Sequence, residues 1–196
     1  MTRTRWLQAA AIVIVFAVAA WGASRLLERM VSPVQEQQTA PAPAAPAANV
    51  AHIIATLYYG TPDGQALVAV KREVPLGEGP RAQGHQNLQS ELEAAPAPYV
   101  SLVPPGTILR AFYITERGDA FVDLSPEAST MHPGGSTNEL LTVYAIVNAV
   151  TANLSSVERV QILIDGKQAD TLAGHVDLRR PFERDTSLVR ETKGTQ

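Results

Sequence analysis

The pattern of apolar and polar positions divides the chain into three zones. The first is an uncharged and almost wholly apolar run of 19 residues, Trp6–Ser24. An α-helix of that length spans about 28 Å, close to the roughly 30 Å hydrocarbon core of a bilayer. Tryptophans lie near both ends of the run and arginines flank it, as at membrane interfaces. The pattern predicts a transmembrane anchor or a signal sequence over residues 6–27, with residues 1–5 in the cytoplasm.

Whether this segment is retained stays open. Ala17-Val18-Ala19 offers the small residues of a signal-peptidase site behind a basic start. The apolar run continues beyond that site through Trp21, and the total length favours a retained anchor. In either case we expect the rest of the chain on the outer side of the bacterial cytoplasmic membrane, in the periplasm or outside the cell.

The second zone, residues 28–50, is a tract rich in Pro and Ala with little charge. Its prolines lie at positions 33, 41, 43 and 46. Proline blocks helix formation and favours an extended, polyproline-like chain. The tract therefore predicts a semi-rigid linker between the anchor and the third zone.

The third zone, residues 51–188, carries the patterns of a folded domain. Apolar or alternating runs predict strands over residues 52–59, 67–74, 108–115, 120–124, 157–164 and 168–172. Helices are expected over residues 80–95 and 139–153. Tight turns such as Asp165-Gly166 join consecutive strands into antiparallel pairs.

This order repeats a unit of two strands and one helix. We therefore predict an α+β fold in which two helices pack on one face of a single mixed, largely antiparallel sheet. The transmembrane helix and the Pro/Ala linker precede this domain, and residues 189–196 are expected to form a disordered tail.

The two expected helices differ in character. The first has a thin apolar face, and Gly84 in its interior is less favourable than Ala by roughly 1 kcal/mol. We expect it to be marginal and surface-exposed, so that a partner could cover it. The second is apolar almost all round and is predicted to be buried. Ser136 and Glu139 at its start fit a capping box.

Composition and charge exclude several classes of function. The chain has no cysteine, which excludes disulfides, thiolate nucleophiles, iron–sulfur clusters, Cys-based zinc sites and a lipid-modified cysteine. Residues 51–196 carry 12 Lys or Arg against 17 Asp or Glu. This mild acidity argues against a nucleic-acid partner.

The titratable residues form no recognisable catalytic or metal motif. The four histidines, which fall in different predicted elements without metal-ligand spacing, are His52, His85, His132 and His175. Asp119 and Asp123 flank one strand and could serve as an acid–base pair. The favoured interpretation is structural, with Asp119 in a turn and Asp123 tying the Ser-Pro turn next to it.

Other polar and aromatic residues also receive structural roles. Ser125 and Ser136 lack the Gly-x-Ser-x-Gly context of a nucleophile, and Gly134-Gly135 is expected to lead into a capped helix rather than to cradle an anion. Asn148 and Thr151 should bond to neighbouring backbone. The aromatic residues Tyr58, Tyr59, Tyr99, Phe112 and Tyr113 are expected to fill the core more often than an interface, while an edge strand could accept a partner's strand. No catalytic, cofactor-binding or metal-binding residue is predicted.

Several phrases of the sequence resemble a known domain. They include Thr-Leu-Tyr-Tyr at 56–59, Val-Pro-Pro-Gly-Thr at 103–107, Gly-Asp-Ala-Phe-Val-Asp-Leu-Ser at 118–125 and the run from Gly134 to Asn153. Together they resemble the GerMN domain, the sporulation and spore germination domain, over residues 51–182. The resemblance implies a small α+β domain anchored outside the cytoplasm, used for binding or assembly in envelope proteins, with no established catalytic residues.

The combined expectation is a non-enzymatic, single-pass membrane protein that binds another envelope protein or a cell-wall component and needs no cofactor. Two alternatives stay open. One is a peptidoglycan-processing or glycan-binding accessory protein that uses Asp119 and Asp123. The other is a homo-oligomeric subunit of a ring or filament.

Overall fold

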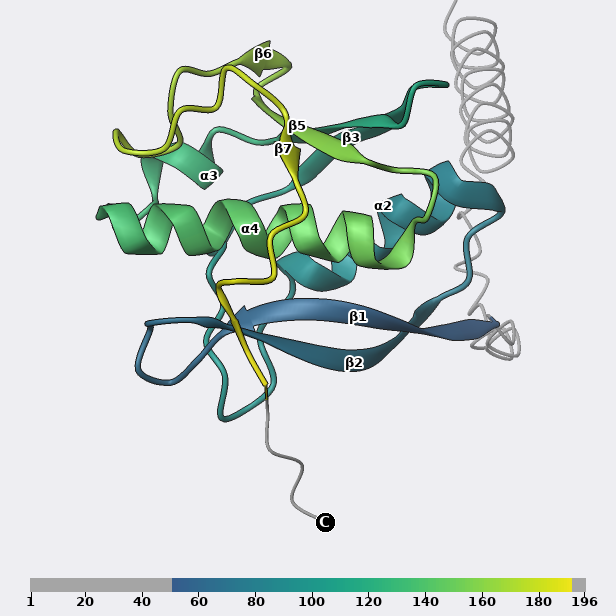
Figure 1. Ribbon diagram of the computed structural model, residues 1–196, viewed down its shortest axis with the longest axis horizontal. Helices are drawn as coiled ribbons and strands as arrows, with labels where there is room; N and C mark the ends of the chain where they lie inside the picture. The colour runs from purple at the N-terminus through teal and green to yellow at the C-terminus, as the bar shows by residue number, and fades with distance from the viewer. Residues whose placement is uncertain (1–50, 192–196) are drawn as a thin grey trace, which may run out of the picture. The chain divides into compact units, whose positions relative to one another are not determined.

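The computed structural model describes residues 51–191, which form two β-sheets with helices between them (Figure 1). The predicted anchor at 6–27 and the linker at 28–50 lie outside the described residues. Among the helices of residues 51–191, none has the length and apolar character needed to cross a bilayer.

The first sheet is a hairpin extended by a short strand. Strands β1 (His52–Gly60) and β2 (Leu67–Pro75) pair antiparallel, as their alternating pattern predicts. Strand β8 (Val189–Arg190) pairs parallel with the start of β2. The domain's contacts therefore continue two residues past the expected boundary at 188.

The second sheet has the order β3-β4-β5-β6. Strands β3 (Leu109–Ile114) and β4 (Asp119–Leu124) form an antiparallel hairpin, and β5 (Arg159–Ile164) lies parallel to β4. Two short strands, β6 (Lys167–Gln168) and β7 (Phe182–Glu183), pair antiparallel with β5.

Strand β6 has only two residues, where five were expected at 168–172, because the chain leaves the sheet directly after the tight turn. Asp165 and Gly166 hold that turn with φ of 53° and 74°, as the dipeptide predicts.

Helices occupy the space between the two sheets. The long helix α4 (Ser136–Asn153) contacts β1 on one side and β5 and β7 on the other, and α2 (Gly79–Leu92) contacts β1, β2, β3 and α4. A third helix, α3 (Glu127–Thr130), is a single turn after β4.

The α+β class is confirmed, but the prediction of a single sheet with both helices on one face is wrong. Helix α4 explains the difference, since it is apolar on opposite sides. Leu141 and Ala145 pack with Tyr58 of β1, whereas Ile146 packs in the core with Ile162 of β5. A helix that is apolar all round must be covered on both sides, and two sheets achieve this.

The expectation that the first helix is exposed is also wrong. Helix α2 buries a polar face that includes Gln83, Asn87 and Glu91. Gly84 permits this close approach, because a Cβ atom there would lie 2.2 Å from the Phe112 ring of β3. The glycine that lowers helix propensity is thus the residue that lets α2 pack beneath the second sheet.

Candidate functional site

The two candidate carboxylates do not form a pair. Asp119 and Asp123 lie four residues apart on β4, which separates them by about 13 Å at 3.3 Å per residue. The Oδ1 atom of Asp119 accepts hydrogen bonds of 2.8 Å from Arg159. The Oδ1 atom of Asp123 accepts one of 2.7 Å from the Gly166 amide, so Asp123 ties the β5–β6 turn and not the Ser-Pro turn that was predicted.

The histidines lie on separate elements, although His132 and His175 both lie near Glu139, with His175 Nδ1 3.2 Å from Glu139 Oε2. His52 begins β1 and His85 lies on α2. The Gly134 amide donates to Nδ1 of His132 at 3.0 Å, which leaves Nε2 to donate to Thr142 Oγ1 at 3.0 Å. Burial lowers the pKa of His132. Within residues 51–191, no group of three or more His, Asp or Glu side chains is placed to hold a metal ion.

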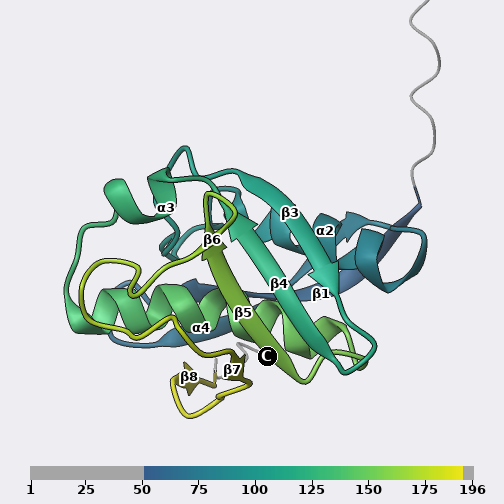
Figure 2. The ribbon, with the colours of Figure 1, turned by 90° about the horizontal axis from the view of Figure 1, so that it is seen from above.

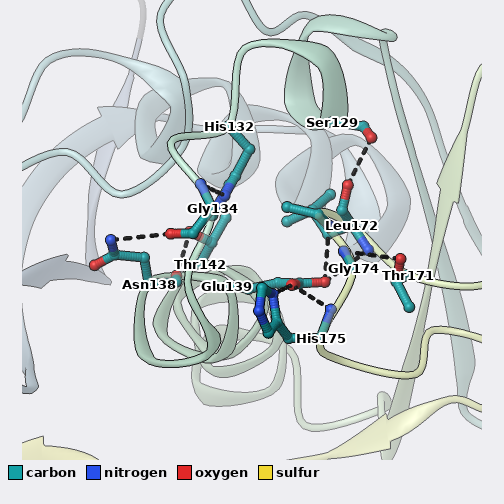
Figure 3. A network of polar contacts seen from close by, with 11 residues as sticks. Ser129, His132, Gly134, Asn138, Glu139, Thr142, Thr171, Leu172, Gly174 and His175 are labelled. Carbon is teal, nitrogen blue, oxygen red and sulfur yellow. Dashed lines mark hydrogen bonds and ion pairs between the residues drawn. The ribbon is translucent and has the colours of Figure 1, made fainter.

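A dense polar network surrounds Glu139, at the start of α4 (Figure 3). Its side chain is completely buried. The Oε1 atom accepts hydrogen bonds of 2.8 Å from the amides of Leu172 and Ala173, and Oε2 accepts one of 2.8 Å from the His175 amide. Burial alone would raise the pKa of Glu139, but these amides favour the carboxylate and the net shift is downward.

The capping-box prediction is therefore wrong. Ser136 is the first helical residue, so the N-cap position is held by Gly135, which has no side chain that could cap the helix. Glu139 instead reaches the segment between β6 and β7, where it binds the amides of Leu172, Ala173 and His175. Its carboxylate holds that segment against α4 and, being buried and bonded on both oxygens, is poorly placed for proton transfer.

The expected structural roles of Asn148 and Thr151 are confirmed. The side-chain amide of Asn148 donates to the Asp185 carbonyl at 2.7 Å and accepts from its amide at 3.1 Å. The hydroxyl of Thr151 donates to the Val147 carbonyl at 2.8 Å. Ser125 Oγ accepts a hydrogen bond of 2.9 Å from the backbone amide before β3, at Ile108.

Among the aromatic residues, three are buried in the cores and one is exposed. Tyr58, Tyr59 and Phe112 are at most 3% exposed, as expected of core residues, and Tyr99 is half-buried. Tyr113 is 48% exposed on β3. It is the aromatic side chain of this group that is available to a partner.

The β1 edge of the first sheet is closed between Thr56 and Gly60 by two side chains and one backbone segment. Asn153 accepts from the Thr56 amide at 2.8 Å and donates to its carbonyl at 2.7 Å. Glu91 accepts from the Tyr58 amide at 3.0 Å. Val100 exchanges two backbone hydrogen bonds with Gly60, of 2.8 and 3.0 Å. Strand β1 therefore offers no edge to a partner over this stretch.

The free edge of the second sheet is different. Strand β3 is terminal in its sheet, and Figure 2 shows it at the margin with part of α2 extending beyond it. Tyr113 faces Phe121 across the hairpin and the Thr115 amide donates to Asp119, so the alternate residues Phe112 and Ile114 direct their backbone groups away from β4.

Two hollows of about 400 Å³ each lie in succession between one face of α2 and the chain from Thr107 to Phe112. We call them together the α2–β3 groove. The residues that line the first are Glu78, Arg81, Ala82, His85, Arg110, Ala111 and Phe112. The residues that line the second are Gln89, Leu92, Glu93, Thr107, Ile108 and Leu109.

The charges of the groove are unevenly placed. The first hollow has two arginines and a histidine against one glutamate, although the domain as a whole is acidic. Arg81 donates to the Phe112 carbonyl at 3.2 Å, and its guanidinium carbon lies 5.1 Å from the centre of the Tyr113 ring. Arg110 forms ion pairs with Asp123 and Asp165. This site could not be predicted from the sequence, because helix and strand patterns do not reveal which strand ends a sheet.

Comparisons with known proteins agree with the fold. The family profile described as Germane, sporulation and spore germination, matches residues 56–170. The structure of a predicted lipoprotein from Clostridium perfringens is similar with a TM-score of 0.51 and 26% identity, over 70% of this chain and 91% of that chain.

Two structures of the sporulation protein GerM from Bacillus subtilis share the fold at 20% identity. The tandem GerMN domains give a TM-score of 0.57 over 74% of this chain and 51% of that chain. The first GerMN domain gives 0.51 over 68% of this chain and 96% of that chain. No match of comparable significance is found among curated protein sequences.

Proposed function

The chain belongs to the Germane family of sporulation and spore germination domains, and we propose that it is a non-enzymatic binding module of the cell envelope. In this proposal residues 6–27 anchor it in the cytoplasmic membrane, residues 28–50 act as a spacer, and the domain binds another envelope protein outside the cytoplasm. The apolar run Trp6–Ser24 supports the anchor.

The relative from Clostridium perfringens, described as a predicted lipoprotein, also supports a place at the membrane. The sequence has no cysteine that could carry a lipid, so we assign attachment to residues 6–27 themselves. We expect the full chain to sediment with membranes and a chain of residues 31–196 to remain in the supernatant. Sedimentation of the shorter chain with membranes would contradict this assignment.

One observation carries the binding function. The α2–β3 groove is accessible and lies beside an unpaired strand edge, whereas the carboxylates Glu139, Asp119 and Asp123 are occupied in holding turns, strands and loops. A protein partner requires accessible backbone groups and apolar side chains. Acid–base catalysis requires titratable side chains within hydrogen-bonding reach of a substrate.

The test is cross-linking of the full chain in its native membranes with formaldehyde, followed by purification and identification of the adducts. We expect one envelope protein to be enriched reproducibly. A chain of residues 1–50 is the matched control, since it keeps the proposed anchor and linker and lacks the domain. An adduct pattern that is the same for both chains would contradict a binding role for the domain.

The peptidoglycan-processing alternative has its own test. Catalysis by Asp119 and Asp123 requires separate acid and base roles within about 5 to 9.5 Å for known glycosidase geometries, and these residues lie farther apart along β4. We expect Asp119→Asn and Asp123→Asn to leave peptidoglycan turnover by cells unchanged. Turnover that depends on the parent chain and disappears in both variants would favour the alternative.

A further inference from the structure

We propose that the α2–β3 groove binds an extended segment of a partner protein, which adds a strand to the free edge of β3 and places an acidic side chain near Arg81. The inference rests on the proposed binding function and names its surface and the chemistry of its ligand. It is carried by the backbone of β3, by the shape of the groove and by its charge.

The backbone of β3 presents the groups that strand addition needs. Phe112 and Ile114 direct their amides and carbonyls outward at alternate positions, as an added strand requires. Within residues 51–191, the outward groups of these two residues receive one hydrogen bond, which Arg81 donates to the Phe112 carbonyl. An unpaired row of this kind is a template for another strand.

Helix α2 forms one wall of the groove beside the β3 edge. Ala82 and Leu92, which lie on one face of α2, line successive parts of the groove. Ile108, which is 64% exposed, and Tyr113, which is 48% exposed, flank the edge near its two ends. A segment lying along β3 would direct alternate side chains toward α2, so we expect apolar residues at every second position.

The charge of the first hollow selects the ligand. Arg81, Arg110 and His85 face it against the single carboxylate of Glu78. Arg110 is already ion-paired with Asp123 and Asp165, whereas Arg81 makes its recorded hydrogen bond to a carbonyl. A carboxylate on the bound segment therefore has Arg81 as its natural partner.

The probe is a random library of twelve-residue peptides displayed on phage and selected on the purified full chain. We expect enriched peptides with apolar residues at alternate positions and an Asp or Glu at one fixed place. Ile108→Glu should weaken binding of the synthetic peptides at least tenfold, through an unfavourable charge at the groove. Met131→Glu is the matched control, because Met131 is 60% exposed and lies beyond the groove after α3.

The backbone contact has a separate readout. Peptide binding should slow hydrogen exchange of the Phe112 and Ile114 amides, and leave unchanged the exchange of the Thr56 and Tyr58 amides, which are already bonded. Arg81→Gln should weaken peptides that carry the acidic residue more than peptides in which that residue is alanine.

Four results would overturn the proposal. One is the absence of any enriched sequence pattern, and another is binding that resists Ile108→Glu with no protection of Ile114. The third is peptide binding that strengthens when residues 31–50 are deleted, which would assign the groove to that segment of the same chain. The fourth is a chain that dimerises and loses its dimer on Ile108→Glu, which would assign the groove to a second copy. Envelope adducts that persist in Ile108→Glu would leave the binding function standing on another surface.

Discussion

Two of the terminal strands, β1 and β3, are treated in opposite ways. The edge of β1 is closed from Thr56 to Gly60 by Asn153 of α4, Glu91 of α2 and Val100 of the loop after α2. Within residues 51–191, the outward edge of β3 accepts a hydrogen bond from one side chain, that of Arg81, and lies beside a groove. Unpaired edges invite uncontrolled association, so proteins usually cover them. The domain covers the β1 edge thoroughly, so exposure of the β3 edge is a specific feature of that strand rather than a general property of the sheets.

Helix α2 takes part in both arrangements. Toward its C-terminal end it contributes Glu91 to the closed edge, and toward its N-terminal end it places Gly84 and Arg81 at the open one. Substitutions on α2, and of Asn153 on α4, therefore allow the contribution of each edge to stability to be measured separately. The stability of each variant is measured by urea unfolding of a chain of residues 49–196.

The largest effect is expected for Gly84→Ala. Alanine is normally favoured over glycine inside a helix by about 1 kcal/mol. Here the new Cβ would lie 2.2 Å from a Phe112 ring carbon and 2.8 Å from a Leu154 methyl group, so α2 must move away from β3. We expect a net loss of about 3 kcal/mol, at the upper end for overpacking. Gln89→Ala on the exposed side of α2 is the control, and an unchanged stability in Gly84→Ala would show that the contact has room to relax.

Asn153→Ala should open the closed edge. It removes the partner of both the amide and the carbonyl of Thr56, and we expect a loss of about 2 kcal/mol. Asn138→Ala on the same helix is the control, because its side chain is exposed and makes one hydrogen bond, to the Gly134 carbonyl. Equal effects of the two substitutions would mean that the closed edge adds nothing special to stability.

The closed edge should also respond to pH through Glu91. Burial raises the pKa of Glu91 well above its ordinary value, so the folded state holds a proton that the unfolded state releases. The folded state is therefore most stable at a pH below the pKa that Glu91 has in the unfolded chain. This stability is lost as the pH rises through the higher pKa that Glu91 has in the folded state. Glu91→Gln keeps an acceptor for the Tyr58 amide without titrating, and should be more stable than the parent at pH 8, by on the order of 1 kcal/mol.

The measurement for Glu91 is the free energy of unfolding between pH 5 and pH 9. The difference between parent and Glu91→Gln should grow with pH. Glu93→Gln, whose side chain is 60% exposed, is the control and should leave the slope of the parent unchanged. A parent whose stability does not fall across this range would contradict burial of a neutral Glu91.

The smallest effect is expected at the open edge. Arg81→Ala removes the hydrogen bond to the Phe112 carbonyl, which water can replace because the side chain is exposed, and should change stability by less than about 0.5 kcal/mol. A loss near 2 kcal/mol would show that Arg81 closes the β3 edge as firmly as Asn153 closes that of β1.

Local patterns in the sequence predicted much of the fold. The Asp165-Gly166 turn, the hairpins and the buried character of α4 follow from backbone preferences and apolar periodicity. The two-residue strands β7 and β8 could not be predicted, because they are too short to carry a pattern. The second sheet was missed because the sequence shows that α4 is apolar all round without showing that different strands cover its two sides.

The site was harder to predict than the fold. Glu139 fitted a capping box, but amides distant in sequence bind its carboxylate. Gly84 indicated a weak helix, yet its meaning depends on Phe112, which is 28 residues away. In both cases a local rule was overridden by a tertiary contact, and no pattern within a single element reports such a contact.

Helix α4 has a further consequence, for the cooperativity of folding. Because opposite sides of one helix complete the cores of both sheets, separation of either sheet from α4 exposes one apolar side of the helix. The domain should therefore unfold in a single step. A partner that binds only the second sheet would then protect the first sheet from unfolding to the same extent, since both are lost in the same transition.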